Sequence, residues 1–517
     1  MKSKVMSRES AVALIKDNST VAVGGFIGSG HPEEISLEIE KSFLNNDSPK
    51  GLNLVYAAGQ GDGKEKGLNH FGHEGLLSRV IGGHWGLAPK LQKLALDNKM
   101  EAYNLPQGII SHLYRDIAAG KPGTLTHVGL KTFVDPRNGG AKLNSLTKED
   151  IVKLINIEGK EYLLYKTFPI DVAIIRVTYA DEEGNATLEK EAMTLDCTSM
   201  AQAAKNSGGI VIIQAEKIVE KDTLDPRFVK IPGIYVDAIV VSKPENHMQT
   251  FSESYNSAYS GEKKGVVNDV GVLPLDERKV IARRALMELK ANSITNLGIG
   301  MPEGISLVAN EEGVAHEMVL TVEAGPVGGV PAAGLSFGAS TNPLSILDQC
   351  EQFDFYDGGG LDIAFLGLAQ CDKKGNINVS KFGPKIAGCG GFINITQNAK
   401  KVIYCGTFTG GGLKLKICDG KLNILNEGKF NKFINTVEQV TFSGEYAYEV
   451  GQIVLYITER AVFRLGKDGL ILEEIAPGVD LQKDILDHMD FKPIISENLK
   501  NMDEKLFKED LIGIKLN

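Results

Sequence analysis

Hydrophobic residues along this chain gather in short continuous runs, and these runs alternate with stretches that have helical periodicity. The runs 20–23, 52–57, 171–177 and 208–219 are apolar at most positions. They lack the strict alternation of a strand with one exposed face. Continuous runs of this kind are typical of parallel strands that helices cover on both faces. We therefore predict an α/β fold of open, mostly parallel sheets flanked by helices.

The second half of the chain repeats the motif order of the first half. Segment 28–37, GSGHPEEISL, and segment 298–307, GIGMPEGISL, are identical at seven of ten positions. The motif that runs from DVA to DEEGN at 171–185 returns as DIA to DKKGN at 362–376. Two similarities in the same order indicate an internal duplication.

The length of the chain agrees with such a duplication. At 517 residues it exceeds the roughly 250–300 residues at which one hydrophobic core stops growing. We predict two tandem, related domains at 1–255 and 276–517. The small, polar and glycine-bearing segment 256–275 is the predicted linker. Amphipathic helices are also expected near the N-terminus, within 1–20, and in the charged tail at 481–493.

Glu323 is a single acidic residue within a glycine-rich stretch. Residues 319–322 predict a buried strand, and the following Gly and Pro residues prevent its extension into a helix. Glu323 is therefore expected at the carboxyl end of a strand, where open α/β sheets bind ligands. The alternative is a solvated loop acid. Aligning the two halves places Ala57 opposite Glu323, so the fold does not need an acid there, and this favours a chemical role.

Two features of the first half offer hydrogen-bond donors. Strand 20–23 leads into GGFIGSGHP at 24–32. Backbone N–H groups of such a loop suit an anion or an oxyanion at a helix start, although ordinary turn chemistry explains the glycines about equally well. Its spacing is not the G-x-G-x-x-G of dinucleotide sites. Gln107 lies in a Pro/Gly turn, and its amide can donate to an oxyanion without titrating.

Other site types do not fit the sequence. Segment 59–64 resembles a P-loop, but it has Ala58 where the motif needs Gly, and Glu65 where it needs Ser or Thr. The histidines between 70 and 84 have no metal-ligand spacing and are expected to be ordinary packing or hydrogen-bonded residues. The six cysteines occur singly, as reduced core residues do. We predict no metal site.

Composition narrows the class of protein further. The chain is 43% hydrophobic and 24% charged, and its net charge of −10 argues against non-specific nucleic-acid binding. No apolar run approaches the roughly 20 residues that span a bilayer. The charged N-terminus does not match a signal peptide. We expect a cytoplasmic protein without a membrane partner, and, as is common for paired α/β domains, a homo-oligomer.

These motifs together resemble family I coenzyme A transferases, and most of all the single-chain propionate or acetate CoA-transferases. The resemblance rests on VGGFIGSGHPEEI, NLGIGMPEGI, VEAGPVGG, GGGLDIAFLG, DKKGN and AGCGGFINIT, and it extends from about 21 to 415. Two-subunit relatives have S-E-N-G around the glutamate, whereas this chain has V-E-A-G, as the fused members do. The resemblance implies tandem open α/β domains of the kind also found in sugar-phosphate and translation-factor relatives.

The resemblance also implies an activity and its site. The expected reaction transfers CoA between a short-chain acyl-CoA and a free acid such as acetate, propionate, butyrate or lactate. CoA is then a substrate, and no cofactor is bound permanently. Glu323 is implied as the nucleophile, with Gln107, Gly24 and Gly25 around the reacting carbonyl. The implied CoA contacts are Gly298, Gly300, Met301, Gly388, Gly390 and Gly391. The alternatives are a thioester hydrolase on the same scaffold and a non-catalytic protein that binds CoA or a small acid.

Overall fold

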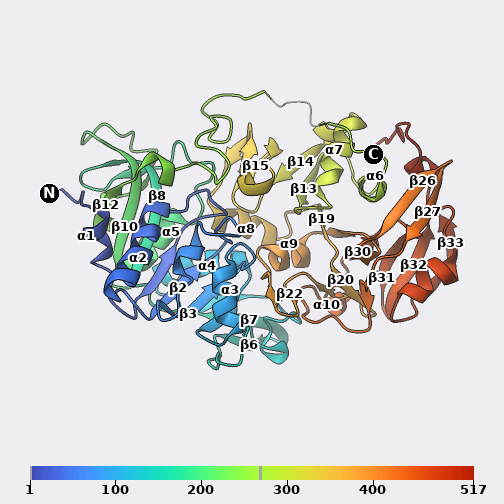
Figure 1. The fold of residues 1–517 in the computed structure, drawn as a ribbon, viewed down its shortest axis with the longest axis horizontal. Helices are drawn as coiled ribbons and strands as arrows, with labels where there is room; N and C mark the ends of the chain where they lie inside the picture. The colour runs from blue at the N-terminus through green and yellow to red at the C-terminus, as the bar shows by residue number, and fades with distance from the viewer. Residues whose placement is uncertain (1–2, 267–270, 517) are drawn as a thin grey trace. The chain divides into compact units, whose positions relative to one another are not determined.

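The computed structural model describes residues 3–266 and 271–516. The chain forms two compact units (Figure 1), which we call unit 1 and unit 2. Unit 1 comprises 1–266, 322–354 and 382–394, and unit 2 comprises 267–321, 355–381 and 395–517. Two segments of the second half thus belong to unit 1. The predicted domains 1–255 and 276–517 describe the two copies of the sequence repeat, and their boundaries remain a prediction.

Unit 1 is built on a sheet of parallel strands. Their order is β12–β10–β8–β1–β2–β3–β4. The bounds are Ala238–Val241 (β12), Ile210–Val219 (β10), Val172–Asp181 (β8), Thr20–Val23 (β1), Leu52–Tyr56 (β2), Leu77–Gly82 (β3) and Glu101–Asn104 (β4). Short antiparallel strands β9 (Ala186–Thr187) and β11 (Val229–Ile231) extend it beside β8. The prediction of a mostly parallel sheet is confirmed.

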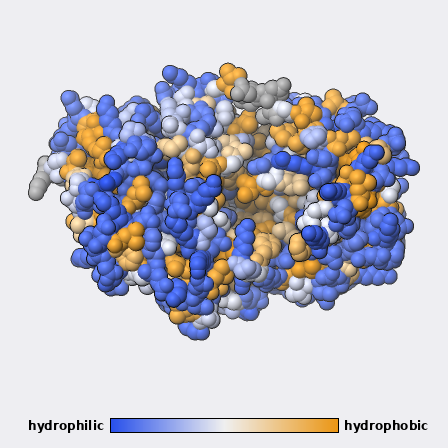
Figure 2. Space-filling model, viewed as in Figure 1, coloured by the Kyte–Doolittle hydropathy of each residue, from blue (hydrophilic) through white to orange (hydrophobic). Residues whose placement is uncertain are grey.

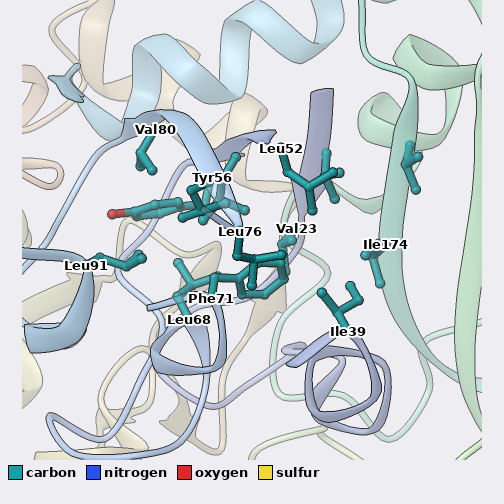
Figure 3. Close-up of a cluster of buried hydrophobic side chains, with 14 of the residues drawn as sticks. Val23, Ile39, Leu52, Tyr56, Leu68, Phe71, Leu76, Val80, Leu91 and Ile174 are labelled. Carbon is teal, nitrogen blue, oxygen red and sulfur yellow. The ribbon is translucent and has the colours of Figure 1, made fainter. Parts of the chain in front are cut away.

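Helices bury the apolar side chains of this sheet. Alternate residues of β1, β2 and β8 point into one hydrophobic cluster, to which α2 (Glu33–Asn46) and α3 (Pro89–Leu96) contribute Ile39 and Leu91 (Figure 3). The helices α4 (Gln107–Ala118) and α5 (Cys197–Asn206) pack together, and α5 lies against β8 and β10. A separate three-stranded sheet joins β5 (Gly123–Thr126), β7 (Lys160–Lys166) and β6 (Val152–Ile157).

Unit 2 has a second sheet of the same kind. Its strands run in the order β14–β13–β19–β24–β30, all parallel, and continue through β31, β32 and β33. The bounds are Met318–Thr321 (β14), Ser293–Leu297 (β13), Ile363–Gly367 (β19), Lys401–Cys405 (β24), Ile453–Ile457 (β30), Ala461–Gly466 (β31), Gly469–Ile475 (β32) and Ile494–Asn501 (β33). Helices α6 (Glu277–Leu286), α7 (Glu303–Glu311) and α10 (Gly444–Glu449) and the hairpin β26–β27 (Lys414–Cys418, Lys421–Asn426) complete the main elements.

The duplication is visible in the topology of each unit. In unit 1, β1 lies between β2 and β8, with Val21 paired to Leu54 and to Val172. In unit 2, β13 lies between β14 and β19 in the same parallel sense. Even a detail recurs: the carboxylate of Asp171 accepts from the N–H of Thr20, as that of Asp362 accepts from the N–H of Ile294. The prediction of two related α/β halves is confirmed.

Two predicted helices are shorter than expected. The N-terminal helix, α1, covers only Arg8–Val12, because the chain turns at Asp17 and Asn18 to enter β1, with Asn18 at φ +62°. In the tail, Leu481–Ile485 forms a π-helical turn and Leu486–His488 a 3₁₀ turn. Pro493 and the start of β33 leave no room for a regular helix.

The surface has the mixture of hydrophilic and hydrophobic residues that is usual for proteins. On the face drawn in Figure 2, hydrophilic residues predominate and hydrophobic residues occur in scattered groups. Scattered exposed apolar residues are normal for protein surfaces. Within 3–266 and 271–516, none of the helices is both long enough and apolar enough to cross a membrane.

Candidate active site

Glu323 lies in a tight turn just after a strand, as the sequence predicts. The turn is closed by two hydrogen bonds, from the N–H of Val322 to the carbonyl of Pro326 (2.9 Å) and from the N–H of Gly325 to the carbonyl of Val322 (3.0 Å). Gly325 has φ +122°, and a Cβ atom there would collide with the carbonyl of Leu347. The side chain of Glu323 is half-buried between the buried residues Val322 and Ala324. The backbone of the turn is therefore fixed at the point from which this side chain extends.

The glycine loop after β1 packs beside this turn. Val322 and Ala324 share a hydrophobic cluster with Phe26, Ile27 and Ala58. The loop itself is closed by a hydrogen bond from the N–H of Phe26 to the carbonyl of Ser29 (2.8 Å). Loop 24–30 and the Glu323 turn, which lie about three hundred positions apart in the printed sequence, thus meet within unit 1.

The two leading glycines of this loop differ in their contacts. The N–H of Gly24 donates to the carbonyl of Ile174 (3.0 Å), so it is already used within the sheet. Gly25 has φ +148°, and a Cβ atom there would stand 2.6 Å from Oε1 of Gln60. Its backbone therefore approaches Gln60 as only glycine can. Of this pair, Gly24 is the one whose N–H is already bound within the sheet.

A buried histidine holds Gln60 in place. Nδ1 of His31 lies 2.6 Å from Oε1 of Gln60, and its Nε2 lies 3.0 Å from Oγ of Ser36. Gln60 in turn donates from Nε2 to the carbonyl of Val23 (2.9 Å). Burial lowers the pKa of His31 to about 4, although the Glu33 carboxylate opposes the shift. The imidazole is neutral at pH 7, so its single N–H donates to Gln60 and its other nitrogen accepts from Ser36.

Gln107 is the first residue of α4 and meets the second glycine loop, 388–391. Its backbone N–H donates to the carbonyl of Gly390 (2.9 Å), and the N–H of Gly390 donates to the carbonyl of Gly83 (2.8 Å). The N–H of Cys389 donates to Oδ1 of Asn104 (2.9 Å). Gly388 has φ +80°, and Gly390 has φ +51°. Loop 388–391 is therefore fixed against the ends of β3 and β4 and the start of α4.

The side-chain amide of Gln107 is held by a second amide. Nε2 of Gln107 donates to Oε1 of Gln349 (3.1 Å), and Nε2 of Gln349 donates to Oγ of Ser111 (2.7 Å) and to Oδ2 of Asp196 (2.7 Å). All four side chains are at most 9% exposed. A buried network of this kind has defined donor and acceptor directions.

His84 lies among glycines of the same region. A Cβ atom on Gly59 would stand 2.5 Å from Nδ1 of His84, and one on Gly86 would stand 2.8 Å from its Cε1. The ring keeps some exposure, but desolvation lowers its pKa to about 4, and the charge of Lys385 adds to this effect. His84 is therefore a neutral ring at pH 7, packed where a larger neighbour would not fit.

Comparison with known proteins identifies the family of the chain. Residues 5–242 match the family model described as coenzyme A transferase. The chain is 48% identical to the acetate CoA-transferase YdiF of Escherichia coli K12, over 99% of this chain and 96% of that protein. It is 47% identical to the caffeate CoA-transferase of Acetobacterium woodii, over 99% and 98%.

The chain belongs to the coenzyme A transferase family. Solved structures agree: the acyl-CoA transferase YdiF from Escherichia coli O157:H7 matches as apoenzyme with a TM-score of 0.95 at 46% identity, over 100% of this chain and 98% of that one. A thioester complex of that enzyme with CoA matches with a TM-score of 0.93 at 46% identity, over the same shares. The resemblance stated from the motifs is confirmed, and so is CoA transfer as the activity.

The coenzyme A transferase fold brings most of the predicted site residues into one unit. Unit 1 contains Glu323 together with the two glycine loops and the amide, namely Gly24, Gly25, Gln107, Gly388, Gly390 and Gly391. The remaining three, Gly298, Gly300 and Met301, belong to unit 2. There the N–H of Gly298 donates to the carbonyl of Phe365 (2.8 Å), and Gly300 is exposed with φ +83°.

Several residues that contact the predicted site residues are not predicted from the sequence. Gln60 follows the end of β2 within the glycine-rich segment that was rejected as a P-loop, and its glycines were a usable signal of close backbone packing. Asp196 and Gln349 stand in sequence contexts without a motif, so only the fold reveals their contact. His84 was predicted to be a packing residue, and its position between Gly59 and Gly86 agrees with that prediction.

Metal ligands and thiols do not form a cluster in the region described. Within 3–266 and 271–516, no group of three or more His, Cys, Asp or Glu residues is arranged to hold a metal ion. The six cysteines are free, and all but Cys418 are buried. Burial raises the pKa of the Cys389 thiol, which lies in the second glycine loop. A thiol that stays protonated is a poor nucleophile.

Proposed function

We propose that this coenzyme A transferase works by a ping-pong reaction in which Glu323 is the nucleophile. The observation that carries the proposal is the placement of Glu323: a half-buried carboxylate in a turn fixed by Gly325, beside the glycine loop 24–30. A carboxylate attacks a thioester only if it is held in contact and not fully solvated. The fixed turn and the partial burial of the side chain support this role.

The proposed reaction has two half-reactions. The carboxylate of Glu323 attacks the acyl-CoA carbonyl, the C–S bond breaks, and an acyl-glutamyl anhydride and CoA thiolate result. The thiolate then attacks the side-chain carbonyl carbon of Glu323, which releases the first acid as its carboxylate and leaves a glutamyl-CoA thioester. A second carboxylate reverses these two steps. No proton is gained or lost, so no general acid or base is needed.

Each attack passes through an oxyanion, and two donors are proposed to stabilise it. The side-chain amide of Gln107 has a second N–H beyond the one given to Gln349. The N–H of Gly25 is the other donor, whereas Gly24 shapes the loop because its N–H is taken by Ile174. One oxyanion donor is commonly worth about 3 kcal/mol of the barrier.

The substrates proposed are acyl-CoA and short-chain carboxylates such as acetate, propionate, butyrate and lactate. The acetate CoA-transferase relative supports this class, and the caffeate CoA-transferase relative makes an aromatic acid the first competitor to test. The proposed CoA contacts are Gly298, Gly300, Met301, Gly388, Gly390 and Gly391. A homo-oligomeric, cytoplasmic enzyme without a permanently bound cofactor completes the proposal.

Intact mass measurement tests the nucleophile. The protein is incubated briefly with acetyl-CoA or propionyl-CoA, beside Glu323→Ala and the control Glu182→Ala, which removes an exposed carboxylate. We expect one CoA on the peptide with Glu323 in the wild type and in the control, and none in Glu323→Ala. Borohydride should reduce the thioester and inactivate the charged enzyme permanently. Acid-dependent CoA exchange without any adduct would overturn the role of Glu323, and CoA release without an acceptor acid would indicate a hydrolase.

A further inference from the structure

Asp196 is a buried carboxylate that the proposed reaction does not use. It precedes α5, is 5% exposed, and its Oδ2 accepts from Nε2 of Gln349 (2.7 Å) and from Oγ of Ser111 (3.1 Å). Its Oδ1 has no hydrogen-bond partner among the described residues. Burying a carboxylate without a cationic partner is costly. A hydrophobic or amide side chain would fill this position with a smaller desolvation penalty. The presence of an aspartate here therefore needs an explanation.

When Asp196 is ionised, the hydrogen bonds around it have only one direction. An ionised carboxylate can only accept, so Gln349 must turn its NH₂ group toward Asp196. The carbonyl oxygen of Gln349 then faces Gln107, and Gln107 must donate to it from its own NH₂ group. If Gln349 were flipped, its carbonyl oxygen would face the carboxylate, and two acceptors would repel each other. The direction set at Asp196 is thus passed on to Gln107.

The orientation of Gln107 decides what it offers to a substrate. In the observed orientation, one N–H is bound to Gln349, the other is free to donate, and Oε1 lies on the side of Gly390, 3.8 Å from the position of a Cβ atom there. The opposite orientation would place the carbonyl oxygen where the NH₂ group now stands. A carbonyl oxygen would repel an oxyanion instead of stabilising it.

We propose that Asp196 is a positioning residue for the acyl site, which fixes the side-chain amide of Gln107 through Gln349 so that Gln107 presents an N–H. The inference rests on the proposed role of Gln107 in oxyanion stabilisation. In this proposal Asp196 acts only through Gln349 and Gln107. Ser111 supports it by donating to the same carboxylate oxygen, which keeps Oδ2 turned toward Gln349.

The ionisation of Asp196 should make the activity depend on pH. Burial raises its pKa to about 7, and the hydrogen bond from Ser111 acts against this shift. The titratable groups around it come from three elements: Asp348 and Cys350 near the start of α8 (Gln349–Asp357), His112 and Tyr114 on α4, and Cys197 on α5. Asp348 raises the pKa of Asp196, His112 lowers it, and burial keeps the thiols and Tyr114 neutral. A charged carboxylate binds Gln349 more strongly than a neutral one, so the hold weakens as the pH falls through about 7.

A double-mutant cycle on kcat tests the proposal. Gln107→Ala and Asp196→Ala are each expected to lower kcat about 10- to 100-fold, within the range for the loss or misplacement of an oxyanion donor. The double variant should be no slower than Gln107→Ala, because Asp196 acts only through that amide. Ser199→Ala is the matched control: it removes a buried hydroxyl on α5 that bonds the backbone carbonyl of Asp196, and it should leave kcat unchanged. Effects that multiply in the double variant would overturn the inference.

The conservative variant Asp196→Asn separates positioning from general packing. Its Oδ1 can still accept from Gln349, so kcat at pH 8 should stay within about threefold of the wild type, and the decline below pH 7 should disappear. A decline that persists in Asp196→Asn would contradict the titration of Asp196. All variants are also tested for the CoA adduct on Glu323. An adduct in each of them with multiplying effects overturns this inference alone, whereas no adduct in the wild type overturns the proposed mechanism.

Discussion

Gly25 and Gln60 approach each other so closely that a Cβ atom on Gly25 would stand 2.6 Å from Oε1 of Gln60. Gln60 cannot move away, because His31 and the carbonyl of Val23 hold both ends of its amide. The contact fixes the backbone of the glycine loop at the point where its N–H is proposed to meet the substrate. The side chain of Gln60 thus supports the backbone of the glycine loop.

The substitution Gly25→Ala tests this support. Its φ of +148° is unfavourable for any side chain, and the new methyl group would collide with Gln60, so we expect kcat to fall at least 10-fold and the free energy of unfolding to fall by about 1–3 kcal/mol. Steady-state kinetics and denaturant unfolding measure the two effects. Gly63→Ala is the control, since Gly63 also has positive φ, +75°, but nothing lies within 4 Å of its added Cβ. It should cost about 1 kcal/mol and leave kcat unchanged.

Shortening the proposed nucleophile should be nearly as damaging as removing it. Glu323→Asp keeps the charge but withdraws the carboxylate by one methylene group from a position that the turn at Gly325 does not allow to shift. Because a misplacement of about 1 Å can cost roughly 100-fold, we expect at least that loss in the rate of CoA adduct formation. Rapid-quench mass spectrometry measures the rate, with Glu323→Gln as the variant that forms no adduct. A rate within threefold of the wild type for Glu323→Asp would contradict a fixed nucleophile.

Much of this fold is predictable because its signals are local. The apolar run at 20–23 gives β1, Asp276 gives the N-cap of α6 by accepting from the N–H of Lys279, and the repeated motifs give the shared topology. Glu323 could be singled out because its counterpart in the first half is Ala57. Each of these conclusions needs only neighbouring residues or an internal alignment.

The supporting contacts depend on distant residues and are therefore absent from such signals. Gln349 donates to Asp196 and accepts from Gln107, and these three residues belong to different parts of the chain. Nothing in the residues around Asp196 indicates that it is buried without a cation. The helical segments α1 and Leu481–Ile485 are shorter than predicted for a related reason. Amphipathic spacing indicates a helix but does not indicate where tertiary contacts make the chain turn.

The stability of unit 1 should depend on pH through His31. Its pKa of about 4 in the folded protein lies below the value near 6.5 of an unfolded chain, so between these values the unfolded state binds the proton first. The contribution is complete above about pH 6.5 and is lost as the pH falls toward 4, and it amounts to roughly 3 kcal/mol at most. Denaturation midpoints at several pH values should fall less steeply in His31→Gln than in the wild type. His316→Gln, at a side chain that is 74% exposed, should keep the wild-type slope; equal slopes in all three proteins would contradict the prediction.

The repeated aspartates Asp181 and Asp372 should affect stability without affecting catalysis. Oδ1 of Asp372 accepts from the N–H groups of Lys374 (2.9 Å) and Asn376 (3.1 Å), and Oδ1 of Asp181 accepts in the same way two and four residues on, at 2.9 and 3.0 Å. Both carboxylates are at most 3% exposed and close a turn after a strand, so each motif is explained by the turn alone. Asp372→Ala removes a charged acceptor from two N–H groups and should lower the free energy of unfolding by about 1–3 kcal/mol, whereas Asp372→Asn, which retains an acceptor, should lose less. Denaturant unfolding measures this loss, and kcat of the folded fraction should match the wild type. If kcat falls while the protein is fully folded, the repeated motif has a chemical role that its hydrogen bonds do not reveal.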